Sequence, residues 1–225
     1  MYVPESYLAA IIMVAISSFG AVCNGVVVVS SMRLPKMDNP FGRISGNLAM
    51  LEGMSLALYL FYYTPMVFFN IHVLQTWSRY FGAFLIGSSQ FVLYAHFLMS
   101  LNRFSAIFFP FHYTKIFSLA NTRIFIIVIW SAAIIPTIFI YVIGSCRFMY
   151  FSDYWRFGFG PTDECPEAPF PTNVQCFSVW IILIMLLDFT AIYRVRMYNK
   201  GMTGGGVYSC WTTKRKSEEI KLLKQ

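Results

Sequence analysis

The sequence has little charge, few cysteines and none of the common catalytic patterns. Asp, Glu, Lys and Arg make up only 12% of its 225 residues, about half of the roughly 25% found in ordinary soluble domains. Soluble enzymes and disordered linkers both need charged residues to stay solvated in water. So little charge therefore argues against both classes. The five cysteines are too few and too scattered for a disulfide-rich secreted module.

Catalytic motifs are also missing. The chain has no nucleophile elbow, no His-Glu-x-x-His zinc helix and no glycine loop between a strand and a helix that would hold a phosphate. We therefore predict that the protein is not an enzyme, and we assign it no metal site and no cofactor.

Long apolar runs dominate the chain instead. Hydrophobic residues make up 57% of it and the mean hydropathy is +0.59. A helix needs about 20 apolar residues to cross a bilayer, and runs of that kind extend over residues 7–32, 46–69, 80–101, 124–143 and 172–193. The runs are continuously apolar rather than alternating, which favours helices over a β-barrel. We predict an all-α membrane protein, a bundle of five transmembrane helices.

Positive charge gathers in alternate connecting segments. Of the 17 lysines and arginines, all but Arg79, Arg147 and Arg156 fall on the side of the membrane that also holds the carboxyl end. Membrane proteins keep Lys and Arg on the cytoplasmic side. We therefore predict an extracellular N-terminus and a cytosolic tail over residues 201–225. The net charge of +7 then reflects membrane topology, and we expect a lipid bilayer rather than nucleic acid as partner.

The longest segment predicted to be outside, residues 144–171, is rich in aromatic residues and proline. It is either a lid packed over the helices or a set of aromatic side chains resting among lipid headgroups, and the two interpretations have equal weight. Cys146 and Cys165 bracket this loop, and an oxidising compartment allows a disulfide between them. Closing a loop of this size would stabilise the fold by about 3 kcal/mol. Cys176 is a rival partner for Cys146.

Polar residues inside the runs are candidates for function. Glu52 lies in the middle of the second run, where a carboxylate must face the bundle interior. It is either an ion or proton site that biases helix packing, or a protonated structural residue bonded to Asn24 or another polar side chain. We expect Asn24 to make an interhelical hydrogen bond, which contributes about 0.6–2 kcal/mol.

Three further polar residues have structural explanations. Arg103 lies at the end of the third run. The pattern alone favours a helix-terminating arginine whose side chain extends to the membrane–water interface. A histidine such as His96 is more often a packing residue than a proton relay. For Asp188, a structural pairing or hydration at the interface is favoured over a substrate site. A transporter that uses Glu52, His96 and Asp188 ranks low, because they share no obvious face or repeat.

Three motifs together resemble those of rhodopsin-like G-protein-coupled receptors. Asn24 resembles the asparagine of the first helix. Asn47-Leu-Ala-Met-Leu-Glu52 resembles the second-helix Asn-Leu-Ala-x-x-Asp motif, with Glu in place of Asp. Asn102-Arg103-Phe104 resembles the Asp-Arg-Tyr motif that ends the third helix. Their order, spacing and shared topology agree with a single architecture, a bundle of seven helices.

A narrower resemblance is to the nematode serpentine receptors of class x. The segment from Leu101 to Phe117 is similar to the one that follows the third helix in that family. Asn39-Pro-Phe-Gly-Arg43, Glu52 and the outer loop with Cys146 and Cys165 fit the same family. The resemblance implies a chemosensory receptor of the plasma membrane, which detects an unknown small molecule or peptide and signals to a heterotrimeric G protein.

The resemblance also implies roles for individual residues. Arg103, with Asn102 and Phe104, would contact the G protein or lock the inactive state. Glu52, with Asn24 and Asn47, would mark the polar site within the membrane. We expect a ligand pocket among helices two to five, beneath the outer loop that holds Cys146 and Cys165.

The sequence departs from the receptor class in two ways. Rhodopsin-like receptors usually bridge the third helix to the second outer loop, but no cysteine lies between Cys23 and Cys146. The sixth and seventh helices have no counterpart, so we expect a partial receptor domain over residues 1–200, truncated before the sixth helix. The alternative function is then a non-signalling isoform that modulates full-length receptors, through a homo- or hetero-oligomer of receptors.

Overall fold

The computed structural model describes residues 5–160 and 174–203. Nearly all of the described residues are helical, apart from one β-hairpin. The elements in chain order are α1 (Glu5–Arg33), η1 (Pro35–Met37), α2 (Pro40–Leu58), η2 (Tyr59–Tyr63), α3 (Thr64–Phe68), α4 (His72–Phe108), α5 (Pro110–Ile116), α6 (Leu119–Thr137), η3 (Ile138–Ile143), β1 (Phe148–Phe151), β2 (Arg156–Phe159) and α7 (Val174–Thr203).

The five predicted spans are confirmed as helices. Within the described residues, five helical segments are long and apolar enough to cross a membrane: Tyr7–Arg33, Pro40–Phe68, His72–Phe108, Leu119–Ile143 and Cys176–Tyr198. The third span is longer than the apolar run at residues 80–101, because its polar ends remain helical. Helix α7 continues to Thr203, so it enters the segment predicted as a tail. The rest of that tail lies outside the described residues.

Two prolines lie inside spans, and both helices continue past them. A proline cannot donate a backbone hydrogen bond to the preceding turn. The turn before Pro65 widens into the π-helical η2, and the Thr64 hydroxyl donates to a carbonyl of that turn at 2.9 Å. After Pro136 the helix changes into the π-helical η3, and the Thr137 hydroxyl donates to a carbonyl one turn back at 2.7 Å. Both spans thus stay helical through their prolines, with a π-helical turn and a hydroxyl-to-carbonyl hydrogen bond beside each one.

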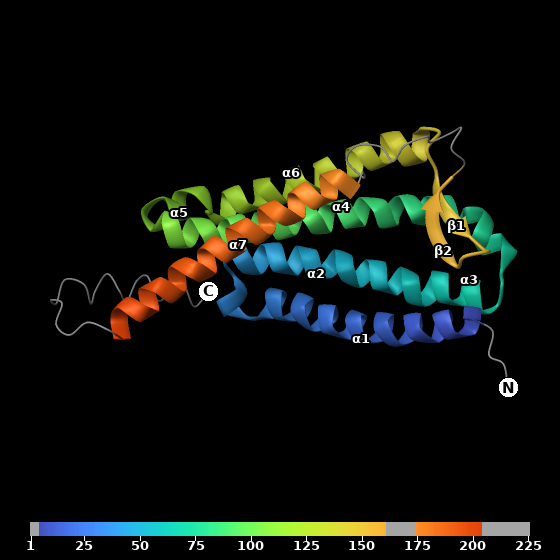
Figure 1. Cartoon of the computed structure of the whole chain (residues 1–225), viewed down its shortest axis with the longest axis horizontal. Helices are drawn as coiled ribbons and strands as arrows, with labels where there is room; N and C mark the ends of the chain where they lie inside the picture. Colours follow the sequence, from blue (N-terminus) through green and yellow to red (C-terminus); the bar gives the residue numbers. More distant parts are fainter. Residues whose placement is uncertain (1–4, 161–173, 204–225) are drawn as a thin grey trace.

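Helix α4 is the central element of the bundle. It packs against α2, α6 and α7, and against strand β1 at one end (Figure 1). The Phe91 side chain of α4 is fully buried, and its ring centroid lies 4.4 Å from that of Trp130 on α6. The core cluster around it consists of Ile44, Leu48, Leu51, Phe91, Ala95, Leu98, Met99, Tyr113, Phe117, Ile126 and Ala133.

The hairpin of β1 and β2 covers one end of the bundle (Figure 1). The two strands pair antiparallel along their full length. The Tyr150 backbone N–H donates to the Ser78 hydroxyl on α4 at 3.2 Å, and the Tyr63 hydroxyl donates to the Trp155 carbonyl. The Tyr150 side chain is buried. Of the two interpretations of the aromatic loop, the structure supports the packed lid for the part of the loop that it describes.

The close approach of the hairpin to α4 requires a glycine. A Cβ atom on Gly82 would overlap the carbonyl oxygen of Phe148 and come within 3.2 Å of its ring. Because that oxygen belongs to the backbone of β1, the whole strand would have to move away from α4. Gly25 on α1 offers a contrast, since a Cβ atom there would meet nothing within 4 Å.

We predict that Gly82→Ala displaces the hairpin and destabilises the protein by about 1–3 kcal/mol, the usual cost of overpacking. Gly25→Ala is the matched control, because it adds the same methyl group to a helix and gains helix propensity without a clash. Thermal unfolding of the two variants in nanodiscs measures the difference. A melting temperature of Gly82→Ala equal to or above that of Gly25→Ala would contradict the predicted clash.

Candidate functional site

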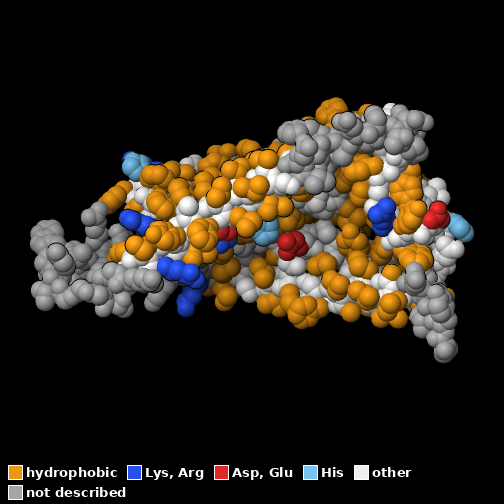
Figure 2. Space-filling model, viewed as in Figure 1, with side chains coloured by type: hydrophobic (Ala, Val, Ile, Leu, Met, Phe, Trp, Pro, Cys, Tyr) orange, Lys and Arg blue, Asp and Glu red, His pale blue; other side chains and the backbone are white. Residues whose placement is uncertain are grey.

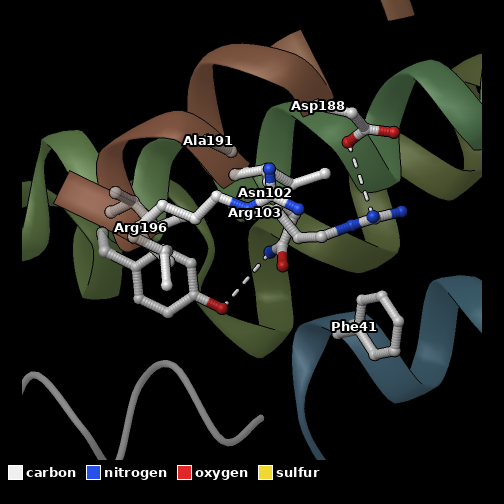
Figure 3. Close-up of a pocket in the computed structure, with 11 residues that line it drawn as sticks. Phe41, Asn102, Arg103, Asp188, Ala191 and Arg196 are labelled. Carbon is white, nitrogen blue, oxygen red and sulfur yellow. Dashed lines mark hydrogen bonds and ion pairs between the residues drawn. The ribbon is translucent and has the colours of Figure 1, made fainter. Parts of the chain in front are cut away.

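The bundle has a cavity at each end, and the one opposite the hairpin contains the predicted motif residue Arg103. This Arg103 cavity has a volume of about 440 Å³ and lies between α2, α4, α5 and α7 (Figure 3). Its lining residues are Phe41, Asn102, Arg103, Ala106, Ile107, Tyr113, Asp188, Ala191, Ile192, Val195 and Arg196.

Arg103 on α4 forms an ion pair with Asp188 on α7. The guanidinium Nη1 lies 3.4 Å from the Asp188 Oδ1, and the two side chains are 47% and 30% exposed (Figure 3). That oxygen accepts no hydrogen bond from any described residue, so the contact is an electrostatic attraction without good hydrogen-bond geometry. A pair this exposed contributes about 0–1 kcal/mol. It can therefore break without unfolding the bundle.

The structural pairing expected of Asp188 is present, and its partner is Arg103 on another helix. The guanidinium carbon of Arg103 also lies 6.0 Å from the ring centroid of Phe41 on α2. This arginine therefore contacts side chains from two other spans, rather than only ending its own helix.

Asn102 points away from this ion pair. Its side chain is buried, and its Nδ2 donates to the Tyr113 hydroxyl on α5 at 3.2 Å (Figure 3). Burial raises the pKa of the Tyr113 phenol above its ordinary value, and the Asn102 hydrogen bond opposes this shift. The phenol therefore stays neutral at physiological pH, and the neutral contact holds α5 against α4.

Phe104, the third residue of the predicted motif, does not line the cavity. Its ring stacks on Phe108 with centroids 4.4 Å apart and meets Phe109 edge-on at 6.1 Å. The structure therefore brings Asn102 and Arg103 to one cavity and places Phe104 in a separate aromatic cluster at the end of α4.

Sequence reasoning missed the contribution of α7 to this cavity. A signal was present, because the lining positions on α7 recur at intervals of three and four residues: Asp188, Ala191, Ile192, Val195 and Arg196. That spacing is typical of one face of a helix. Phe41 and Tyr113 had no such signal, since they come from helices whose packing on α4 the sequence did not reveal.

The predicted polar site inside the membrane does not form one connected group. The Asn24 amide donates to the Gly20 carbonyl at 3.1 Å, and the Asn47 amide donates to the Arg43 carbonyl at 3.0 Å. The interhelical hydrogen bond expected of Asn24 is therefore replaced by a bond within its own helix, because a mid-helix asparagine reaches the carbonyl four residues back. Glu52 is half-buried and, among the described residues, has no hydrogen bond or ion pair.

The second cavity lies under the hairpin. This hairpin cavity has a volume of about 430 Å³ and is lined by Met13, Tyr59, Tyr63, Leu85, Ile86, Ser89, Phe148, Trp155, Arg156 and Phe157. The sequence predicts a pocket among helices two to five beneath the outer loop. The second and third spans and the hairpin do line this cavity. The first span takes the place of the fourth and fifth, because α1 packs beside η2 and α3.

The structure settles the bonding state of two of the three cysteines in or near the outer loop. Cys146 is disulfide-bonded, whereas Cys176 has a free thiol, so the structure does not support Cys176 as its partner. The predicted partner, Cys165, lies outside the described residues, and the pairing of Cys146 with Cys165 stays a prediction.

Comparisons with known proteins agree with this architecture. The model of the family described as "Serpentine type 7TM GPCR chemoreceptor Srx" matches residues 14–225. Serpentine receptor class X-43 of Caenorhabditis elegans is 26% identical over 172 residues, which are 76% of this chain and 54% of that protein. Serpentine receptor class X 45 of the same organism is 25% identical over 222 residues, 97% of this chain and 61% of that protein.

A solved structure shows the same fold. The crystal structure of squid rhodopsin superimposes with a TM-score of 0.66 at 16% identity, over 90% of this chain and 55% of that one. The chain thus spans little more than half the length of the proteins it matches. It is a multi-pass membrane protein with the fold of a seven-helix receptor, and the matching family consists of receptors rather than enzymes. The chain belongs to the serpentine chemoreceptor family Srx.

Proposed function

We propose that this chain forms part of a chemosensory G-protein-coupled receptor of the plasma membrane. A small molecule or peptide would bind in the hairpin cavity, and a heterotrimeric G protein would bind at the Arg103 cavity. The single observation that carries the proposal is the position of Arg103: it lies in a cavity at the opposite end of α4 from the hairpin, and its ion pair with Asp188 is partly exposed.

The distribution of charge supports a cytosolic position for the Arg103 end. Figure 2 shows that the Lys and Arg side chains of the described residues gather mainly at the end away from the hairpin. Arg33 ends α1 there, Arg43 lies in the first turn of α2, and Arg194 and Arg196 lie beyond Asp188 on α7. Positive residues on one side are typical of the cytoplasmic side, so the hairpin cavity would face outward.

Helix α4 connects the two cavities. Near one end it accepts the hairpin hydrogen bond through Ser78 and presents Leu85, Ile86 and Ser89 to the hairpin cavity. Near the other end it carries Arg103. A ligand that favours one packing of α4 would shift the population of helix arrangements at both ends. Separation of α4 from α7 would release Arg103 from Asp188 and make its guanidinium available to the G protein.

Asp188 is the acid that would hold Arg103 in the inactive arrangement. The residue before Arg103 is Asn102, which is neutral and is bonded to Tyr113 instead. Asp188 is the only acid among the described residues that line the cavity. The restraint on Arg103 would therefore come from α7 rather than from its own helix.

We predict that Arg103→Ala abolishes the G-protein response to a ligand. We also predict that Asp188→Asn raises basal signalling about two- to five-fold, because losing an ion pair worth up to about 1 kcal/mol changes the population of the active arrangement by that factor. A resonance-energy-transfer reporter of G-protein activation in cells measures both. Asp153→Asn, which removes an exposed acid from the hairpin turn, is the control and should leave basal signalling unchanged. A response that survives Arg103→Ala would overturn the role of Arg103.

A second candidate function rests on two ionisable side chains inside the spans. His96 on α4 is exposed, and neither it nor Glu52 has a hydrogen-bond or ion-pair partner in the part of the chain that the structure describes. Ionisable groups rarely face lipid. Another polypeptide that covers them would explain their position, and full-length receptors of the same family are the partners that the fold suggests. The chain would then modulate those receptors.

We predict for this second candidate that co-expression of the chain changes the cell-surface level of a full-length family member. His96→Leu combined with Glu52→Gln should weaken the effect, because the polar contacts to the partner are lost. Surface biotinylation of the full-length receptor measures it, and His72→Leu, outside the bundle core, is the control variant. An unaltered surface level of the full-length receptor on co-expression would rule the modulating role out.

A further inference from the structure

Half of the residues that line the hairpin cavity are aromatic. Five of its lining residues have aromatic rings: Tyr59, Tyr63, Phe148, Trp155 and Phe157. Met13, Leu85 and Ile86 add aliphatic surface. The volume of about 430 Å³ lies within the range of about 300–1,000 Å³ that is typical of small-molecule sites. These walls suit a flat aromatic or alicyclic body.

Among the described residues that line the cavity, one is charged, and its charge is positive. Arg156, at the start of β2, lines the cavity, and no Asp or Glu does so among the described residues. An aromatic site without a charge would suit a cation. The guanidinium group of Arg156 repels a cation and binds a carboxylate through two parallel hydrogen bonds. The charge of the site therefore selects an anion.

Arg156 is available for such a ligand. In the part of the chain that is described, it forms no ion pair, and its guanidinium carbon lies 5.1 Å from the ring centroid of Tyr154. The side chain is exposed, so it stands at the mouth of the cavity rather than in its floor. It is also one of only three Lys or Arg residues on the side predicted to be outside, where positive residues are scarce.

The interior of the cavity has little further hydrogen-bonding capacity. The Tyr63 hydroxyl donates to the Trp155 carbonyl, and the Ser89 hydroxyl donates to the Ile86 carbonyl at 2.8 Å. The Tyr59 hydroxyl has no hydrogen-bond partner among the described residues. A ligand could thus place one polar group beside Tyr59, but the rest of its body must be apolar.

We propose that the hairpin cavity binds an amphipathic organic anion, with an aromatic or alicyclic body among the rings and a carboxylate or similar anionic group on Arg156. This ligand class deepens the proposed receptor function and rests on it for its signalling consequence. Binding itself can be measured on the chain alone.

The test uses the chain in nanodiscs and three probes that share one ring system: 2-naphthoate, its neutral carboxamide, and the cationic 2-naphthylmethylamine. We expect 2-naphthoate to bind about ten- to a hundred-fold more tightly than the carboxamide, since a charged hydrogen bond is lost in the latter. The amine should bind most weakly. Equilibrium dialysis with labelled probes measures the three affinities.

Variants assign the selectivity to one residue. Arg156→Gln should remove the preference for 2-naphthoate but leave carboxamide binding unchanged, which shows that the variant is folded, and Arg156→Lys should keep part of the preference. Arg79→Gln is the matched control, because Arg79 donates to the Val142 carbonyl at 3.0 Å and does not line the cavity. A preference that persists in Arg156→Gln, equal binding of the three probes, or no saturable binding of any of them would overturn the proposal.

The same measurements separate this proposal from the receptor function. Anion-selective binding that depends on Arg156, without any G-protein response, would support the ligand class and count against the proposed signalling. A G-protein response to neutral or cationic compounds, with no dependence on Arg156, would support signalling and overturn the ligand class.

Discussion

The hydrocarbon core of the bilayer offers no water to backbone N–H and carbonyl groups, and this constraint governs the structure. It explains why the spans are unbroken helices although Pro65 and Pro136 lie within them. A π-helical turn lies beside each proline, and a threonine hydroxyl there donates to a nearby backbone carbonyl. The same constraint explains why the Asn24 amide donates to the Gly20 carbonyl of its own helix. A carbonyl four residues back is always within reach of a mid-helix asparagine, whereas a polar group on a neighbouring helix is not.

Continuous helices in turn allow the two ends of the molecule to be coupled. Helix α4 is one uninterrupted helix from His72 to Phe108. The hairpin approaches it at Gly82, where any side chain would displace the strand, and Arg103 extends from it at the other end. A tightly packed interior does not deform smoothly. A shift of α4 at the hairpin would therefore change its packing on α7, where the restraint on Arg103 is weak.

Much of this fold follows from the sequence, because hydropathy and the placement of Lys and Arg report directly on the bilayer. The five spans could be predicted for this reason, whereas their ends could not, since helices such as α4 continue into polar segments. Arg103 could be identified from the sequence as a candidate site residue, but its ion-pair partner Asp188 lies on another helix, and only the packing of α7 on α4 brings the two together. The hairpin was expected only as an aromatic loop, because its strand pairing depends on the surface of α4 beneath it.

The two cavities show how the presence of one acid changes what an arginine can do. Arg103 and Arg156 each line a cavity with apolar walls at one end of the bundle. Asp188 pairs with Arg103, so under the proposed mechanism that arginine would stay neutralised until the helices separate. No described acid lines the cavity around Arg156, so its charge is already available to an incoming ligand. Under these proposals, attraction between opposite charges would resist release of Arg103 at one end and would draw an anionic ligand to Arg156 at the other. Helix α4 is the element through which the second event would act on the first.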